Sequence, residues 1–183
     1  MKILGLHYGG HDTSASITIN GKLIAACEEE RYDKEKHTRN FPINAIKDCL
    51  KISKLKINDI DIISYGNDPF LQIREKYLKL AIKDDYRIKA VVDDSLRIKN
   101  LFNTENLLRE KLGFKKKIEF NNHHICHLAS TFFPSGFKKS LIVSYDGIGE
   151  INSALFAVGD KNKIKVTHDK NKYPDSLGLF YTA

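Results

Sequence analysis

The sequence has little cysteine and no long hydrophobic run, and both absences narrow the class of protein. It contains three cysteines, Cys27, Cys49 and Cys126, an odd number without paired spacing. This excludes a disulfide framework and indicates a reducing, cytoplasmic compartment. No apolar run approaches the length of a membrane span, and no basic segment followed by a long apolar one opens the chain. We therefore expect a cytoplasmic globular domain without a membrane partner, long enough at 183 residues to bury a core.

The charge of the chain is biased toward lysine and arginine but is not concentrated. These residues total 30 against 23 aspartate and glutamate residues, a formal net charge of +7. The densest basic run is Lys115 to Lys117, and aromatic residues do not alternate with basic ones as a surface for single-stranded nucleic acid requires. The pattern therefore favours a solvated surface over a nucleic-acid partner such as tRNA. A contribution of this charge to binding small anionic substrates stays open.

Two stretches share one pattern of strands and turns. Residues 3–31 predict an antiparallel meander of three strands, with Asn20-Gly21 as the turn between the second and third. Residues 140–168 repeat the order strand, glycine turn, strand, short turn, strand. Between the two stretches, apolar spacing predicts helices at 43–50 and 70–113 and strands at 60–66 and 116–122.

The strongest candidate for a metal site is a pair of histidines followed by an aspartate. His123 and His127 lie four residues apart in the first turns of a predicted helix, for which Asn121 or Asn122 is the expected N-cap. Residues at this spacing share one helix face, so both imidazoles can reach one point. Asp146 ends an apolar strand. Alone, a histidine pair is usually accidental, but two imidazoles with a carboxylate suit iron(II) or zinc with coordination positions left open.

A second candidate is the glycine-rich turn after the first predicted strand. Gly9 and Gly10 would let backbone N–H groups approach a phosphate closely, and His11 and Asp12 follow them. A tight turn without any ligand explains these glycines equally well, so both interpretations stay open on this segment alone.

The chain resembles a known family in several of these motifs. The sequence HHxxHLAS, a Ser-Gly-Phe loop and a strand ending in Asp-Gly-x-Gly-Glu resemble the antibiotic and nodulation-factor O-carbamoyltransferases. Their catalytic domain is similar to the tRNA threonylcarbamoyl-transfer proteins, within the actin-like ATPase and sugar-kinase superfamily. The resemblance implies an α/β fold, a ribonuclease-H-like lobe over residues 1–139 with a helical insertion at about 70–113. Residues 140–183 would begin a second, truncated lobe.

The resemblance also implies an activity. Carbamoyl phosphate and ATP would give carbamoyl-adenylate, whose carbamoyl group moves to the hydroxyl of a small-molecule acceptor. His11 aligns with a histidine facing the reacting groups and would take the hydroxyl proton, as imidazole can near neutral pH. Lys36 and Arg39, in a Glu-Arg…Lys-His…Phe-Pro pattern that the family shares, become candidates for holding the anionic donor. Arg31 and His37 belong to the same pattern without an assigned role.

The glycine turn that follows the first strand of the second stretch completes the expected site. Gly147 and Gly149 would direct N–H groups at the adenylate phosphate, and Glu150 is grouped with them as a nucleotide-binding residue. Two other functions remain in view: a tRNA threonylcarbamoyl-transfer enzyme, and a non-catalytic module that binds nucleotide or metal. If the second lobe is truncated, the chain should be inactive by itself, and its uncovered strands should favour a homodimer or aggregation.

Overall fold

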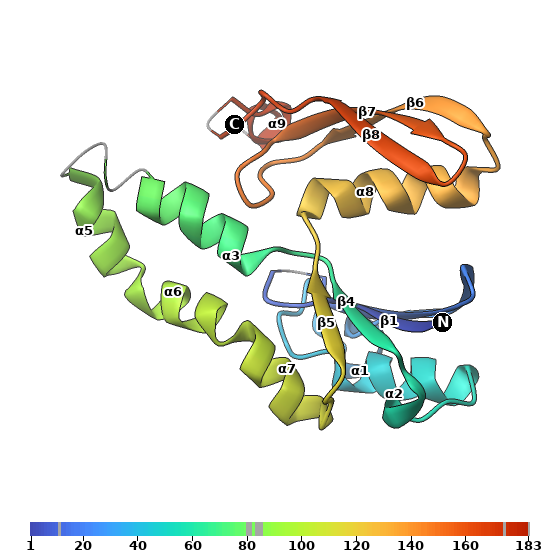
Figure 1. The fold of residues 1–183 in the computed structure, drawn as a ribbon. Helices are drawn as coiled ribbons and strands as arrows, with labels where there is room; N and C mark the ends of the chain where they lie inside the picture. The colour runs from blue at the N-terminus through green and yellow to red at the C-terminus, as the bar shows by residue number, and fades with distance from the viewer. Residues whose placement is uncertain (11, 80–81, 83–85, 174, 183) are drawn as a thin grey trace. The chain divides into compact units, whose positions relative to one another are not determined.

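The structure is a computed structural model that describes residues 1–10, 12–79, 82, 86–173 and 175–182. The chain forms two compact units (Figure 1). Met1–Gly66 and Asn103–Phe120 make the first unit, and Asn67–Phe102 and Asn121–Ala183 make the second. The predicted boundary at 139–140 does not coincide with this division, because the helix that carries the histidines packs on the second sheet.

The first unit is built on a mixed five-stranded sheet. Its strand order is β3-β2-β1-β4-β5, with β1, β2 and β3 antiparallel and with β1, β4 and β5 parallel. This is the ribonuclease-H-like topology expected from the resemblance. Its strands are β1 (Lys2–His7), β2 (Ser14–Ile19), β3 (Lys22–Glu28), β4 (Ile62–Tyr65) and β5 (Lys117–Phe120). Its helices are α1 (Glu30–Asp33), α2 (Ile43–Ile52), the 3-10 turn η1 (Ile57–Asp59) and α7 (Thr104–Leu112).

The turn between β2 and β3 confirms the strongest local prediction. Asn20 and Gly21 have φ angles of 50° and 80°, the left-handed pair that a tight two-residue hairpin needs. Asparagine tolerates this region and glycine has no side chain to oppose it, so this dipeptide sets the register in which Ile19 faces Lys22.

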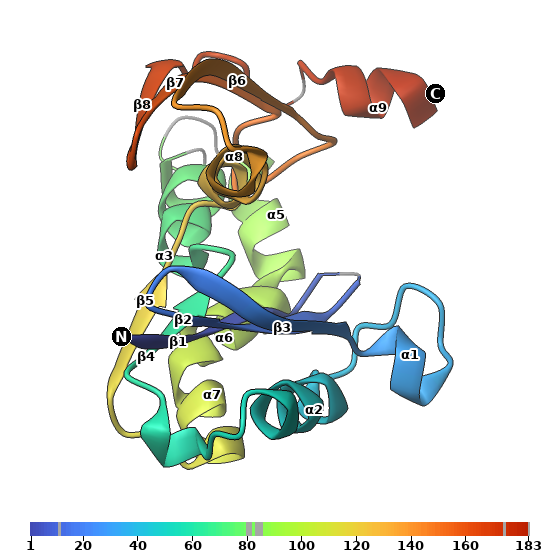
Figure 2. The ribbon, with the colours of Figure 1, turned by 90° about the vertical axis from the view of Figure 1, so that its right-hand side faces the viewer.

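Alternation along the strands places the core of the first unit on one face of its sheet. Leu4, Ile17 and Ile63 are fully buried, and α2 and α7 cover them with small and branched side chains (Figure 2). Gly113 ends α7 in the left-handed conformation, which glycine adopts without a steric penalty. The first residue of this helix, Thr104, is buried.

The second unit contains a three-stranded antiparallel sheet and most of the insertion. The sheet has the order β6-β7-β8 with antiparallel neighbours, so the second meander is confirmed. Its strands are β6 (Lys139–Tyr145), β7 (Ala154–Asp160) and β8 (Lys163–His168). Its helices are α3 (Pro69–Gln72), the π-helical turn η2 (Ile73–Leu78), α5 (Tyr86–Asp93), α6 (Ser95–Phe102), α8 (His123–Phe132), the 3-10 turn η3 (Phe133–Ser135) and α9 (Leu177–Thr182).

Helix α8 runs along the sheet and packs against β6 and β7 (Figure 1). Leu128 and Phe132 on the helix are buried against Ile142 and Leu155 on the strands. The ring of Phe132 lies so close to Gly159 that a Cβ there would fall 2.5 Å from ring atoms. This close packing fixes the helix on the sheet. It thereby places both histidines of the candidate metal site near Asp146, which directly follows β6.

Within the described residues, no helix is long and apolar enough to cross a membrane. The face of β6 opposite α8 does expose three large apolar side chains, Leu141, Val143 and Tyr145. The predicted self-association would depend on a surface of this kind.

Candidate metal centre

The first turn of α8 is held in place by a cap and a buried carboxylate. Asn122 is the N-cap, and its side-chain oxygen accepts a hydrogen bond of 3.1 Å from the N–H of Ile125. The carboxylate of Glu150 accepts the N–H of His123 at 3.0 and 3.2 Å. These acceptors satisfy backbone donors that a helix start leaves open, so the helix begins at His123 with a defined orientation.

Three ligand-type atoms from α8 and the end of β6 converge. The Nε2 atom of His123 lies 2.6 Å from Oδ2 of Asp146 and 2.9 Å from Nε2 of His127. The Nε2 atom of His127 lies 3.5 Å from the same oxygen. Around an ion with bonds of about 2.1 Å, neighbouring ligand atoms lie about 3.0–3.4 Å apart. The three spacings straddle this range, so His123, His127 and Asp146 fit one divalent ion.

Asp146 presents one of its two carboxylate oxygens to the histidines. Its other oxygen, Oδ1, accepts the N–H of Gly147 at 2.6 Å. Burial by itself would raise the pKa of Asp146, but the hydrogen bonds from His123 and Gly147, with the charge of both histidines, lower this pKa overall. The group is therefore an anion at neutral pH and offers Oδ2 as a monodentate ligand.

The site is partly open to solvent. The side chains of His123, Asp146 and His127 are 22, 35 and 50% exposed. Burial and the neighbouring His123 lower the pKa of His127, so its imidazole is neutral and keeps a lone pair for a metal at physiological pH. A metal held by these three candidate ligands would keep coordination positions open on its solvent side, which is typical of catalytic rather than structural metal sites.

His124 lies edge-on to the rings of the other two histidines, but both of its ring nitrogens bond elsewhere. It is fully buried, in line with Leu128 and Phe132. Its Nδ1 lies 2.8 Å from the hydroxyl of Ser144, and its Nε2 lies 2.8 Å from the carbonyl of Asn152. A carbonyl only accepts, so Nε2 carries the proton and the ring is the neutral tautomer. Burial lowers the pKa of His124 and keeps it neutral.

This buried histidine predicts a loss of stability on mild acidification. An unfolded histidine takes up a proton near pH 6.5. Folded His124 resists that proton because its pKa is lowered, so the unfolded chain gains it first as the pH falls below about 6.5. The free energy of unfolding should therefore decrease with falling pH, by at most about 1.4 kcal/mol per pH unit for one proton.

The measurement is urea unfolding of the chain between pH 7.5 and pH 5.5, compared with the variant His124→Gln. The variant lacks the titrating ring and should show a shallower pH dependence, whatever its absolute stability. His127 shifts in the same direction, so part of the slope remains. Equal slopes in the two proteins would contradict this assignment.

Glu150, predicted to bind a nucleotide, is buried and bonded within the protein, and its contact with a nucleotide stays a prediction. It is 1% exposed, and its two oxygens accept the backbone N–H of Asp68 at 2.8 Å, the side chain of Asn122 at 2.8 Å and the N–H of His123. With both oxygens occupied by protein donors, the carboxylate clamps the start of α8 to the β6–β7 turn. Its geometry favours a positioning role over direct contact with a nucleotide.

The two glycines of this turn are likewise engaged within the protein. The N–H of Gly147 donates to Asp146, and the N–H of Gly149 donates to the carbonyl of Asn152 at 2.8 Å. A Cβ on Gly149 would lie 3.0 Å from the ring of His124 and 3.3 Å from His123. The absence of a side chain at Gly149 thus permits the turn to approach the histidines. The role of both glycines as donors to a phosphate stays a prediction.

Cys126 lies between the two candidate ligands in the sequence but does not join them. Burial raises the pKa of its thiol to about 11. The thiol is therefore protonated at neutral pH, and only a thiolate is a good metal ligand. It acts as a packing residue in α8.

The predicted donor-binding residues of the first unit are brought together only in part. Asp12 lies beside His37, with Oδ1 2.7 Å from Nδ1, and both residues have left-handed backbone conformations. Gly9 also has a positive φ, of 91°, and Gly10 follows it. His11 lies outside the described residues, so its role as a base stays a prediction. Lys36 and Arg39 are exposed in the loop between α1 and α2, and their role in holding the donor stays a prediction. Arg31 pairs with Glu28.

The chain matches the family described as Carbamoyltransferase N-terminus over residues 2–183. It therefore belongs to that family. It is 33% identical over 177 residues to the nodulation protein NolNO of Sinorhizobium fredii, a match that covers 93% of this chain and 24% of NolNO. It is 32% identical over 190 residues to the uncharacterized protein sll1178 of Synechocystis, covering 99% of this chain and 31% of that protein.

Among solved structures, YeaZ from Pseudomonas aeruginosa is similar to 92% of this chain and 65% of its own, with 11% sequence identity and a TM-score of 0.47. The chain spans about a quarter of the length of NolNO and about a third of the length of sll1178.

Proposed function

We propose that this chain carries the metal-binding part of an O-carbamoyltransferase that acts on the hydroxyl of a small-molecule acceptor. The donor in this proposal is carbamoyl-adenylate, made from carbamoyl phosphate and ATP. One observation supports it most: His123, His127 and Asp146 converge in a chain that belongs to the carbamoyltransferase family. The metal in the proposal is iron(II) or zinc, both of which accept two imidazoles and one carboxylate.

In the transfer step, the acceptor oxygen bonds to the carbamoyl carbon and the bond between that carbon and the phosphate oxygen breaks. The acceptor proton goes to a base, and AMP leaves with the electron pair of the broken bond. When bound, the metal supplies a Lewis acid that polarises the donor and stabilises the negative charge that develops on oxygen.

The chain's own residues supply orientation and charge for this step. The two imidazole ligands would add no charge and the carboxylate of Asp146 adds one negative charge, which leaves a bound divalent ion with a net positive charge. His124 and Glu150 hold the strand end and the helix start on which the ligands lie. Rigid support of this kind keeps the ligands at the productive geometry without reorganisation during the reaction.

The proposal is tested by transfer of labelled carbamoyl groups. The protein, purified from its native source at its native length, is supplied with labelled carbamoyl phosphate and ATP, and in parallel with carbamoyl-adenylate. We expect transfer to small hydroxyl compounds, loss of transfer after chelation and recovery with iron(II) or zinc. Transfer that requires tRNA would favour the threonylcarbamoyl branch. Metal and nucleotide binding without transfer from either donor to any acceptor would favour a non-catalytic module.

A further inference from the structure

The segment 175–179 lies directly against the backbone of Asp146. The hydroxyl of Ser176 donates a hydrogen bond of 2.8 Å to the carbonyl oxygen of Asp146. The same hydroxyl oxygen accepts the N–H of Leu179 at 3.2 Å, so Ser176 also caps the start of α9. One side chain therefore connects the end of β6 to the first turn of α9.

Gly178 makes the approach between the two backbones possible. A Cβ on Gly178 would lie 2.5 Å from the carbonyl carbon of Asp146 and 2.5 Å from the backbone nitrogen of Gly147. Carbon atoms do not approach each other so closely, and the neighbouring atoms belong to backbone rather than to a flexible side chain. Any residue larger than glycine at 178 must displace α9, the strand end, or both.

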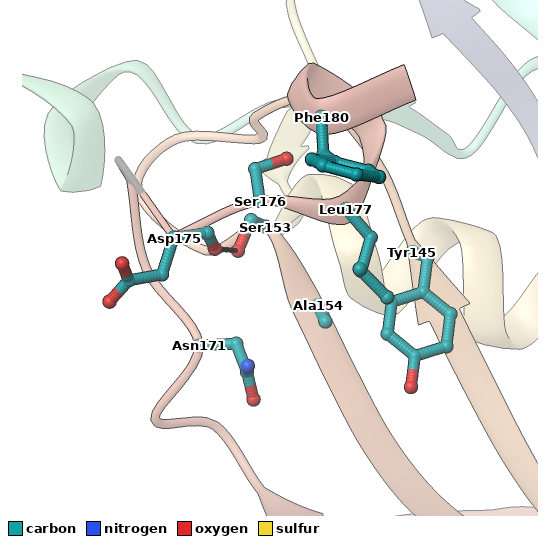
Figure 3. Close-up of a pocket in the computed structure, with 8 residues that line it drawn as sticks. All are labelled: Tyr145, Ser153, Ala154, Asn171, Asp175, Ser176, Leu177 and Phe180. Carbon is teal, nitrogen blue, oxygen red and sulfur yellow. Dashed lines mark hydrogen bonds between the residues drawn. The ribbon is translucent and has the colours of Figure 1, made fainter.

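The other side of Asp146 is held by the same segment through Ser153. The N–H of Asp146 donates to the carbonyl of Ser153 at 2.9 Å, and the hydroxyl of Ser153 donates to the carbonyl of Asp175 (Figure 3). Together with the bond from Gly147 to Oδ1, these contacts fix both the backbone and the side chain of Asp146. Only Oδ2 is left to face the histidines.

We infer that Ser176 and Gly178 are positioning residues that aim Oδ2 of Asp146 at the metal. The inference rests on the proposed function, since it concerns the same metal site. A Cβ at 178 must move from 2.5 Å to an ordinary contact of roughly 3.5 Å, a shift of about 1 Å. Metal–ligand distances tolerate only about 0.2 Å, so even a quarter of that shift at the strand end takes Asp146 out of the ligand geometry. Loss of a supporting residue at a metal site typically weakens binding about 10–100-fold.

The test compares metal affinity among variants of the segment. Gly178→Ala and Ser176→Ala should each weaken cobalt(II) and zinc(II) binding about 10–100-fold and should change the visible spectrum of bound cobalt. Ser176→Thr keeps the hydroxyl and should restore affinity. Tyr181→Ala is the matched control, because Tyr181 is 92% exposed on the same helix.

The outcomes separate this inference from the proposed function. Parent chain that binds no metal would overturn the proposed function, and the inference with it. Parent chain that binds metal, with unchanged affinity and cobalt spectrum in Gly178→Ala and Ser176→Ala, would overturn the inference alone. If Gly178→Ala does not fold, the Ser176→Ala and Ser176→Thr pair decides, since equal affinity in those two variants would overturn it.

Discussion

Replacing His127 by alanine is expected to abolish tight binding of a divalent metal, with a loss of affinity on the order of 100-fold or more. The variant removes one of three candidate ligand atoms. With only His123 and Asp146 remaining, water would occupy most coordination positions of the ion. His127 is the cleanest of the three to replace because its side chain is half exposed and its loss leaves the packing of α8 intact. His123→Ala and Asp146→Asn should reduce affinity comparably.

Competition of the chain with a chelator for zinc(II) and cobalt(II) measures this effect. The matched control is His168→Ala, which removes an exposed histidine of the same unit that bonds Asn171 rather than the metal ligands. The control should keep the affinity of the parent chain. Equal affinity in His127→Ala and the parent would show that this constellation does not hold the metal.

Replacing Glu150 by alanine is expected to lower the free energy of unfolding by about 2–4 kcal/mol. The carboxylate is buried and serves three donors, on Asp68, Asn122 and His123, and its removal leaves these donors without their acceptor in a buried place. It also removes an anion from the start of α8, where the helix dipole favours negative charge. Glu150→Gln should lower the free energy of unfolding by less than Glu150→Ala, because one acceptor oxygen remains. It should still lower it, because the new amide group faces a donor.

Urea denaturation followed by circular dichroism measures this loss. Asp160→Asn is the control for removing an acidic residue, since Asp160 is exposed at the end of β7. The control should change stability by less than about 0.5 kcal/mol. A similarly small change for Glu150→Ala would mean that the clamp contributes little to the fold.

The features that the sequence predicts correctly depend on residues close together in the chain. The Asn20-Gly21 turn, the cap at Asn122 and the shared face of His123 and His127 depend on residues a few positions apart. Geometry of the strand and helix decides such features before any tertiary packing forms. The ligand set also combines two local signals, a helix start and a strand end.

The role of Glu150 shows why the remainder could not be predicted. Its partners Asp68 and Asn122 lie 82 and 28 residues away in the chain, and a buried acceptor and a nucleotide contact look alike in one sequence. The contact of Gly178 with the backbone of Asp146 has no sequence signal either, because glycine in a turn or at a helix start has many causes. Both features depend on the tertiary arrangement of the second unit.

The order of the candidate ligands along the chain has a consequence for folding. His123 and Asp146 are 23 residues apart, and α8 and β6 are neighbours in sequence as well as in space. An ion held by them would act as a reversible cross-link across a short loop and would restrict the unfolded ensemble much as a disulfide does, by roughly 3 kcal/mol in chain entropy. Closing that loop brings helix and strand together in a single event of low contact order. Metal uptake and the folding of this helix–strand pair would then be one cooperative step.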